Sequence, residues 1–215
     1  DMVKKNITAR DIINERSIKN AVACDMALGC SSNSVLHLLA IAHEAGVELD
    51  LNMFNEVSEK TPNLCHLAPA GPTHMQDLYY AGGVQAVLSE LLRGGMIDGG
   101  CMTVTGKTVK ENLDGVKLSK AQNAIRPLEN PYTKTGGLAI LFGNIAKNGC
   151  VVKRSAVAPE MLRHEGKARV FNGEEEAIAA IYAGKINHGD VVVIKYEGPK
   201  GGPGMREMLN PTSAL

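Results

Sequence analysis

Tryptophan is absent from the 215-residue sequence, and aromatic residues together make up only 4% of it. Aliphatic side chains, alanine and methionine must therefore fill the hydrophobic core. Neither sign of charge is in excess, because Lys plus Arg and Asp plus Glu both total 23. Nucleic-acid-binding proteins usually carry a basic excess, so we expect no nucleic-acid partner.

Long hydrophobic runs are also missing. The longest apolar stretches, such as residues 35–41, fall far short of the roughly 20 residues that a membrane span needs. Residues 1–20 carry charges throughout and lack the apolar segment of a signal peptide. The five cysteines are odd in number and widely scattered, which favours reduced thiols over a disulfide framework. We therefore expect a cytoplasmic protein without a membrane partner.

Helical periodicity dominates the first part of the chain. Ser31-Ser-Asn-Ser offers N-capping side chains, and apolar residues follow at three- and four-residue spacing as far as Gly46. Because other faces of this segment are apolar too, it is predicted to be a helix buried on nearly all sides. Further helices are predicted over residues 52–60, 74–80 and 83–93. Residues 1–114 are therefore expected to form a mainly helical part.

The periodicity changes in the second part. Residues 115–131 are polar and aperiodic, and they are predicted to be a linker. Short runs rich in β-branched and aromatic residues then predict strands, and residues 174–182 form an amphipathic helix. The predicted strands are 138–142, 150–153, 168–171 and 191–196. Residues 132–215 are expected to form an incomplete β/α/β domain of the swivelling type, so the fold class is α/β in an α+β arrangement.

A carboxylate beside a glycine-rich loop is the strongest candidate for a binding site. The last predicted strand runs into Glu197, which by strand alternation shares a face with Val191 and Val193. A carboxylate there is costly unless it is exposed, paired or bound to metal. Gly201 and Gly202 lack side chains, so a ligand can approach the backbone N–H groups. A surface turn with a solvated carboxylate is the alternative interpretation.

Ser31 and Asn33 are a second candidate site. They stand where a helix is predicted to begin, and the unpaired N–H groups of a helix N-terminus bind carboxylates or phosphates. An ordinary N-cap is the simpler interpretation of the same residues.

Three segments resemble the dihydroxy-acid/phosphogluconate dehydratase family, and together they span essentially the whole chain. The most specific is the glycine-rich segment after the last strand, which is closer to the dihydroxy-acid dehydratases than to the phosphogluconate dehydratases. Cys30 and Ser32 depart from the family pattern, where Gly and Thr are common. The three segments are Met26-Ala-Leu-Gly-Cys-Ser-Ser-Asn-Ser-Val-Leu-His-Leu38, Gly137-Leu-Ala-Ile-Leu-Phe-Gly-Asn-Ile-Ala-Lys-Asn-Gly-Cys-Val-Val-Lys153 and Tyr196-Glu-Gly-Pro-Lys-Gly-Gly-Pro-Gly-Met-Arg-Glu-Met-Leu209.

The resemblance implies a hydro-lyase of branched-chain amino-acid biosynthesis that converts 2,3-dihydroxy acids to 2-oxo acids. It also implies Mg²⁺ and an iron–sulfur cluster as cofactors, and a homodimeric parent enzyme. By motif position Glu197 corresponds to a Mg²⁺ ligand. The cluster ligands are expected upstream of Asp1 and the catalytic base beyond Leu215. The chain is therefore expected to be an internal fragment that is inactive alone.

Two other functions are compatible with the sequence. The first is a sugar-acid dehydratase of the same superfamily. The second is a non-catalytic domain that binds an anion or a partner protein.

Overall fold

The computed structural model describes residues 1–198 and 208–215 of the chain. Gly201 and Gly202 therefore lie outside the described residues. The chain divides into two compact units, Asp1–Val157 and Ala158–Leu215. This division falls after Val157, whereas the predicted linker covers residues 115–131, so the predicted domain bounds stay a prediction.

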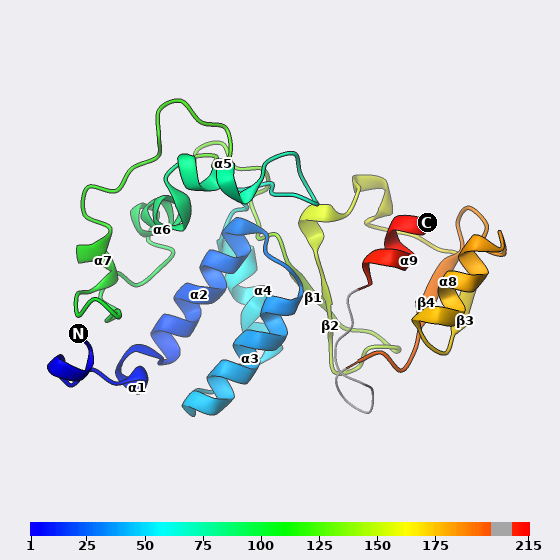
Figure 1. Cartoon of the computed structure of the whole chain (residues 1–215), viewed down its shortest axis with the longest axis horizontal. Coiled ribbons are helices and arrows are strands. Elements are labelled where there is room, and N and C mark those ends of the chain that lie inside the picture. The colour runs from blue at the N-terminus through cyan, green and yellow to red at the C-terminus, as the bar shows by residue number, and fades with distance from the viewer. Residues whose placement is uncertain (199–207) are drawn as a thin grey trace. The chain divides into compact units, whose positions relative to one another are not determined.

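The first unit is mainly helical, with one short β-hairpin (Figure 1). The hairpin pairs β1 with β2 in antiparallel fashion, with Ile140 opposite Val151. Its α-helices and strands are α1 (Ala9–Ile12), α2 (Glu15–Leu28), α3 (Asn33–Ala45), α4 (Leu51–Lys60), α5 (Met75–Tyr80), α6 (Gly83–Arg93), α7 (Val109–Asn112), β1 (Ala139–Leu141) and β2 (Cys150–Val152). The helices and strands predicted for this region are confirmed to within a few residues.

Helix α2 is the centre of the first unit, because it contacts α3, α4 and α6. No prediction covers α2, although its start carries a capping box: the Asn14 side chain accepts a hydrogen bond from the Ser17 N–H, and the Ser17 hydroxyl accepts one from the Asn14 N–H. Gly29, with φ 63°, ends the helix. Local signals for this helix were therefore present in the sequence.

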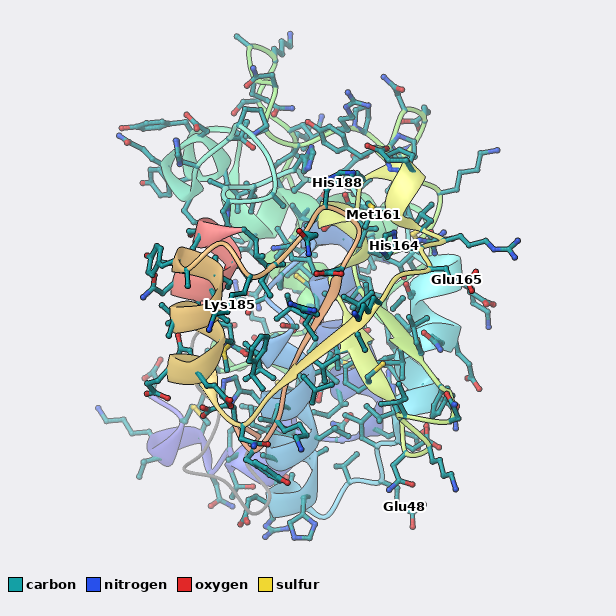
Figure 2. The ribbon with its side chains drawn as sticks, turned by 90° about the vertical axis from the view of Figure 1, so that its right-hand side faces the viewer. Glu48, Met161, His164, Glu165, Lys185 and His188 are labelled. Atoms are coloured by element: carbon teal, nitrogen blue, oxygen red, sulfur yellow. The ribbon has the colours of Figure 1, made fainter. Side chains whose placement is uncertain are left out.

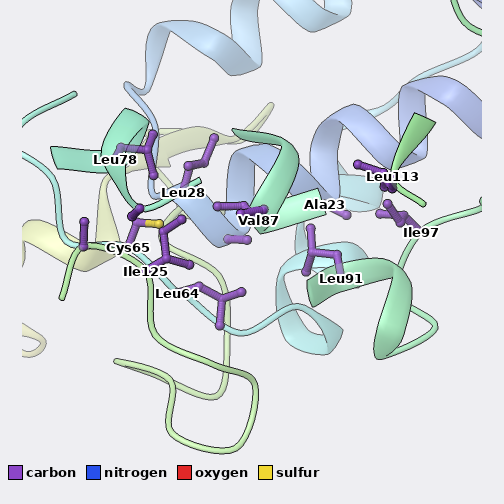
Figure 3. Packing of buried hydrophobic residues seen from close by; sticks show 14 residues of the cluster. Ala23, Leu28, Leu64, Cys65, Leu78, Val87, Leu91, Ile97, Leu113 and Ile125 are labelled. Atoms are coloured by element: carbon purple, nitrogen blue, oxygen red, sulfur yellow. The ribbon is translucent and has the colours of Figure 1, made fainter. Parts of the chain in front are cut away.

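Two clusters of buried side chains form the core of this unit, and α2 contributes to both. One lies between α2, α5 and α6 (Figure 3) and includes Leu28, Leu64, Leu78, Val87 and Leu91. The other joins α2, α3 and α4 to the hairpin and consists of Val22, Met26, Val35, Phe54, Leu138 and Ile140. Aliphatic residues dominate both clusters, as the scarcity of aromatic residues requires.

Residues 115–131 contain no helix or strand, and part of this segment packs on the first unit. Ala124 and Ile125 are each only 1% exposed. The Arg126 N–H donates a hydrogen bond to the Leu64 carbonyl at 2.8 Å. These contacts anchor the segment to the helical core.

Helix α3 is less buried than its sequence indicates, so that prediction is wrong. Only Val35 and Ala42 are buried, whereas Leu36 is 37% and Ile41 44% exposed. The physical reason is that α3 packs through one face against α2 and the second core cluster. An apolar residue type does not by itself bring a helical face into contact with other elements.

The second unit is a β/α/β crossover. Strand β3 (Ala168–Phe171) pairs in parallel with β4 (Val191–Ile194), and α8 (Glu174–Tyr182) connects them. Ala177 and Ala180 of α8 are buried, and α9 (Leu209–Ala214) contacts the same helix. The predicted strands and helix of this unit are confirmed, and so is the α+β class. The swivelling type of the domain stays a prediction.

The turn between α8 and β4 is anchored to the segment before β3. His164 Nε2 lies 3.0 Å from the Gly189 carbonyl oxygen, and His164, Lys185 and His188 are all labelled in Figure 2. Arg169 Nη2 also donates a hydrogen bond to the Lys185 carbonyl. None of the helices within residues 1–198 and 208–215 combines the length and apolar character needed to cross a membrane.

Candidate functional site

Glu197 lies next to the N-terminus of helix α8. Its Oε1 accepts a hydrogen bond of 2.8 Å from the backbone N–H of Glu174, the first residue of α8. Gly173 precedes the helix with φ 114°, and a Cβ there would lie 3.3 Å from Glu197 Oε1. Gly173 therefore gives the carboxylate room to approach the helix end.

The strand does not continue to Glu197, so the alternation argument for its orientation is wrong. β4 ends at Ile194, and Tyr196 has φ 67°, in the left-handed region that β-strands do not use. This backbone turn redirects the chain toward α8. The Glu197 side chain is half-buried and held by a helix N-terminus, so the solvated-turn interpretation does not describe it.

The N-terminus of α8 is acidic. Glu174, Glu175 and Glu176 form its first turn, and Glu176 Oε2 accepts a hydrogen bond of 2.7 Å from the Asn172 N–H. The partial positive charge of a helix N-terminus stabilises carboxylates at this position. The hydrogen bond from the Glu174 N–H therefore orients the half-buried Glu197 carboxylate at the start of α8.

The chemistry of Glu197 fits Mg²⁺, which prefers hard oxygen ligands, uses only one or two carboxylates and retains several waters. A carboxylate that accepts an N–H bond can still coordinate a cation, because its two oxygens offer about four lone-pair positions. No group of three His, Cys, Asp or Glu side chains placed to hold a metal ion occurs among the described residues. The assignment of Glu197 as a Mg²⁺ ligand therefore stays a prediction.

Ser31 and Asn33 are in the first unit, in the short connection between α2 and α3. The Ser31 hydroxyl accepts a hydrogen bond of 3.3 Å from the Asn33 N–H. Ser32 occupies the N-cap position without a side-chain capping bond. The side chain that accepts a hydrogen bond at this helix start is therefore that of Ser31, and the choice between a binding site and an ordinary cap for Ser31 and Asn33 stays a prediction. Glu197 belongs to the other compact unit, Ala158–Leu215.

No sequence motif singles out Asp25, although it is one of the two charged residues that are buried in the described part of the chain. It is only 5% exposed and lies on α2 among apolar residues. Its Oδ2 is 2.8 Å from the Ser34 hydroxyl, at the start of α3. The signal that points to it is a lone acidic residue on the inward face of an apolar helix.

An iron–sulfur cluster is held by thiolates, and Cys24, Cys30 and Cys65 lie where burial disfavours a thiolate. Burial raises the pKa of the Cys24 and Cys65 thiols to about 12. Burial also raises the pKa of Cys30. At neutral pH these three thiols are protonated, and none of them is proposed as a cluster ligand.

Two models of one protein family match the sequence of this chain. The family model described as dihydroxy-acid/6-phosphogluconate dehydratase N-terminal matches residues 1–112, and the corresponding C-terminal model matches residues 123–215. The chain therefore belongs to the dihydroxy-acid/6-phosphogluconate dehydratase family.

Similar proteins named dihydroxy-acid dehydratase occur in several bacteria. The chain is 62% identical to the protein of Carboxydothermus hydrogenoformans, 64% to that of Agathobacter rectalis and 60% to that of Clostridium kluyveri. Each match covers 100% of this chain. The chain spans 38–39% of the length of these relatives.

Proposed function

We propose that the full-length protein containing this chain is a hydro-lyase that dehydrates 2,3-dihydroxy carboxylic acids to 2-oxo acids in valine, leucine and isoleucine biosynthesis. The supporting observation is the 60–64% identity, over all 215 residues, to proteins named dihydroxy-acid dehydratase. In this reaction a base takes the proton from C2 and the C3 hydroxyl leaves as water. The enol that remains tautomerises to the ketone.

The proposed task of Glu197 is to bind a divalent metal ion. A Mg²⁺ ion at this position would neutralise the substrate carboxylate and hold the 2-hydroxyl, and an iron–sulfur cluster elsewhere in the parent would act as a Lewis acid on the leaving hydroxyl. The Glu174 N–H orients the Glu197 carboxylate, as hydrogen-bond donors around a ligand commonly do. Preorganisation of this kind favours tight positioning of the substrate.

The remaining assignments of the site are proposed from the sequence and from the family resemblance. Ser31 and Asn33 are proposed to line the substrate side through the turn that precedes α3. Gly201 and Gly202 are proposed to admit the substrate to the backbone. The base is expected from a segment beyond Leu215 and the cluster ligands from a segment before Asp1. A homodimer and a cytoplasmic location complete the proposal for the full-length protein.

Glu197→Gln in the full-length protein tests the metal assignment. The amide oxygen still accepts the Glu174 N–H, but the negative charge that attracts Mg²⁺ is lost. We expect kcat/KM for dihydroxy-isovalerate to fall by about 100-fold or more, since a metal ligand contributes several kcal/mol. The absorbance of the cluster should not change.

Glu165→Gln is the matched control, because Glu165 is an exposed glutamate of the same unit. It should leave activity and Mg²⁺ dependence unchanged. Wild-type activity of Glu197→Gln at limiting Mg²⁺ would rule out the metal role and leave Glu197 as a helix cap alone.

A sugar-acid dehydratase is the second candidate, because the matching family models also cover 6-phosphogluconate dehydratases. Assays of the full-length protein with dihydroxy-isovalerate and with aldonates separate the two. A preference for an aldonate would overturn the branched-chain assignment, and no turnover of either would favour the non-catalytic alternative.

A further inference from the structure

One serine hydroxyl in the α2–α3 connection has two acceptors within hydrogen-bond distance. Ser34 Oγ lies 2.8 Å from Asp25 Oδ2 and 2.7 Å from the Ser31 carbonyl oxygen. A serine hydroxyl has a single proton and can donate only one full hydrogen bond. The carbonyl can only accept, so the protonation state of Asp25 decides how this cluster is bonded.

The two states differ in the number of hydrogen bonds. If Asp25 is ionised, the carboxylate and the Ser31 carbonyl compete for the same Ser34 proton. If Asp25 is protonated, its O–H donates to Ser34 Oγ, and the Ser34 O–H donates to the Ser31 carbonyl. Only the protonated state satisfies both short contacts at the same time.

The surroundings of Asp25 also favour the neutral carboxyl group. It is 5% exposed, and its Oδ1 is buried without a hydrogen-bond partner in the described structure. An ionised oxygen in that position carries a large desolvation penalty. A neutral carboxyl group avoids most of it.

Three neighbouring groups partly offset the effect of burial on Asp25. Burial raises the pKa of Asp25, while the Ser34 hydroxyl, the Cys30 thiol and the Lys153 ammonium group lower it in part. The neighbouring Cys24 and Cys30 thiols have raised pKa values themselves, mainly through burial, and remain neutral. Lys153 forms no ion pair with Asp25 within 4.0 Å.

We propose that Asp25 is a positioning residue: it retains a proton and, through Ser34, holds the Ser31 carbonyl and with it the turn that presents Ser31 and Asn33. The Ser34 N–H also bonds the Ser31 carbonyl at 3.0 Å, and the Asn33 N–H bonds the Ser31 hydroxyl. Asp25 is therefore connected through Ser34 to the Ser31 carbonyl, and through Ser31 to the bond from the Asn33 N–H. The assignment of a substrate-side role to the turn rests on the proposed function.

A pH dependence follows from this arrangement. The folded state binds the Asp25 proton more tightly than the unfolded state, so the stabilisation is complete at low pH and is lost as the pH rises through the folded-state pKa. Above that pH, Ser34 turns to the carboxylate and the Ser31 carbonyl loses one of its two donors. The turn then becomes less well ordered.

Asp25→Asn and Asp25→Ala in the full-length protein test the proposal. The asparagine amide donates to Ser34 Oγ at any pH and so mimics the protonated acid, whereas alanine removes the donor. Asp114→Asn, on an exposed aspartate of the same unit, is the matched control. Infrared spectra recorded across a pH titration follow the C=O stretch of the protonated carboxyl group.

The expected infrared result does not depend on enzyme activity. In the wild type and in Asp114→Asn, a carboxyl band should persist above the pH of about 4 at which exposed aspartates ionise. Asp25→Asn should lack that band. If the band is absent from the wild type, or titrates with the exposed carboxyl groups, the proposal is wrong, whatever the catalytic activity turns out to be.

Kinetics test the positioning role separately. Asp25→Asn should keep kcat and KM within about 3-fold of wild type, and its KM should not change with pH over the range in which the wild-type band disappears. Asp25→Ala should raise KM by about tenfold with a smaller change in kcat, which corresponds to about 1.4 kcal/mol. If Asp25→Asn raises KM as much as Asp25→Ala does, a carboxylate rather than a donor is required, and the proposal fails.

Discussion

Asp25 and Glu197 are two acidic side chains that the protein treats in opposite ways. Glu197 meets a backbone N–H at the start of α8, where the helix dipole favours a negative charge. Asp25 lies inside the first unit, where its nearest polar partner is a hydroxyl whose only proton has a second acceptor. The two residues differ in donor supply, and the number of donors around a buried carboxyl group is one of the factors that set its pKa.

The backbone near Asp25 is also more tightly packed than the backbone near Glu197. At the α2–α3 connection, Gly29 and Gly137 approach so closely that a Cβ on Gly137 would lie 2.5 Å from the Gly29 Cα. After Glu197, a Cβ on Gly198 would meet nothing within 4 Å among residues 1–198 and 208–215. One region is packed to the backbone, and the other has room beside its carboxylate.

The largest expected effect comes from filling the packed region. Gly137→Ala should lower the free energy of unfolding of the full-length protein by about 3 kcal/mol or more, because the new methyl group meets backbone that cannot rotate away. Gly198→Ala is the matched control and should change it by less than about 1 kcal/mol. Equal losses in denaturant unfolding experiments would contradict the packing difference.

Removing a buried donor should have the next largest effect. Asn63 is 1% exposed and its Nδ2 donates to the Ala27 carbonyl at 3.1 Å, near the end of α2. Asn63→Ala should therefore cost about 2 kcal/mol, since it leaves a cavity and removes a buried hydrogen bond, although the Ala27 carbonyl keeps the Leu64 N–H as a donor. Asn130→Ala, on an exposed turn, is the control and should leave the free energy of unfolding nearly unchanged. Thermal unfolding of both variants measures the difference.

The hydrogen bond by which Glu197 caps α8 should contribute less to the free energy of unfolding than the Asn63 side chain does. Glu197→Ala removes the acceptor of the Glu174 N–H and should destabilise the protein by about 1 kcal/mol. Glu197→Gln retains an acceptor oxygen and should be closer to wild type. If both variants unfold at the wild-type midpoint, the hydrogen bond to α8 has no energetic importance.

The smallest effect concerns chemical labelling and leaves stability unchanged. Cys150 is exposed, whereas Cys24 and Cys30 lie near Asp25 and burial raises the pKa of both thiols. A maleimide at pH ~8 should therefore modify Cys150 first, because the thiolate is the reactive form. Mass spectrometry of digested protein measures the order. Early modification of Cys30 would mean that the Asp25 region opens more readily than its burial indicates.

Much of the local structure could be predicted because its signals are local. The bounds of α6, α8 and β3 agree with the predictions, since apolar periodicity and glycine endings lie within each element. Helix α2 escaped prediction although Asn14 and Ser17 cap it, which shows that a capping motif deserves as much weight as apolar spacing.

The candidate sites were predictable only in part. The motif around Glu197 identified the residue, but its hydrogen bond to Glu174 spans 23 positions and depends on how the turn at Tyr196 is folded. Asp25 could be suspected only as an acidic residue on an apolar helix face. The sequence predicts more burial for α3 than the structure has. Apolar periodicity shows which residues are apolar but does not show which of them other elements pack against.

By itself the sequence determined the family, the class and the positions of most helices and strands, because motifs, caps and periodicity are properties of short segments. Only the tertiary structure decided that Gly137 reaches Gly29, that α8 offers its N-terminus to Glu197 and that Asp25 and the Ser31 carbonyl both lie within hydrogen-bond distance of the Ser34 hydroxyl. Each of these depends on distances between groups that the folded chain brings together. Hydrogen bonding and desolvation act over a few ångströms, so their outcome is set by that proximity.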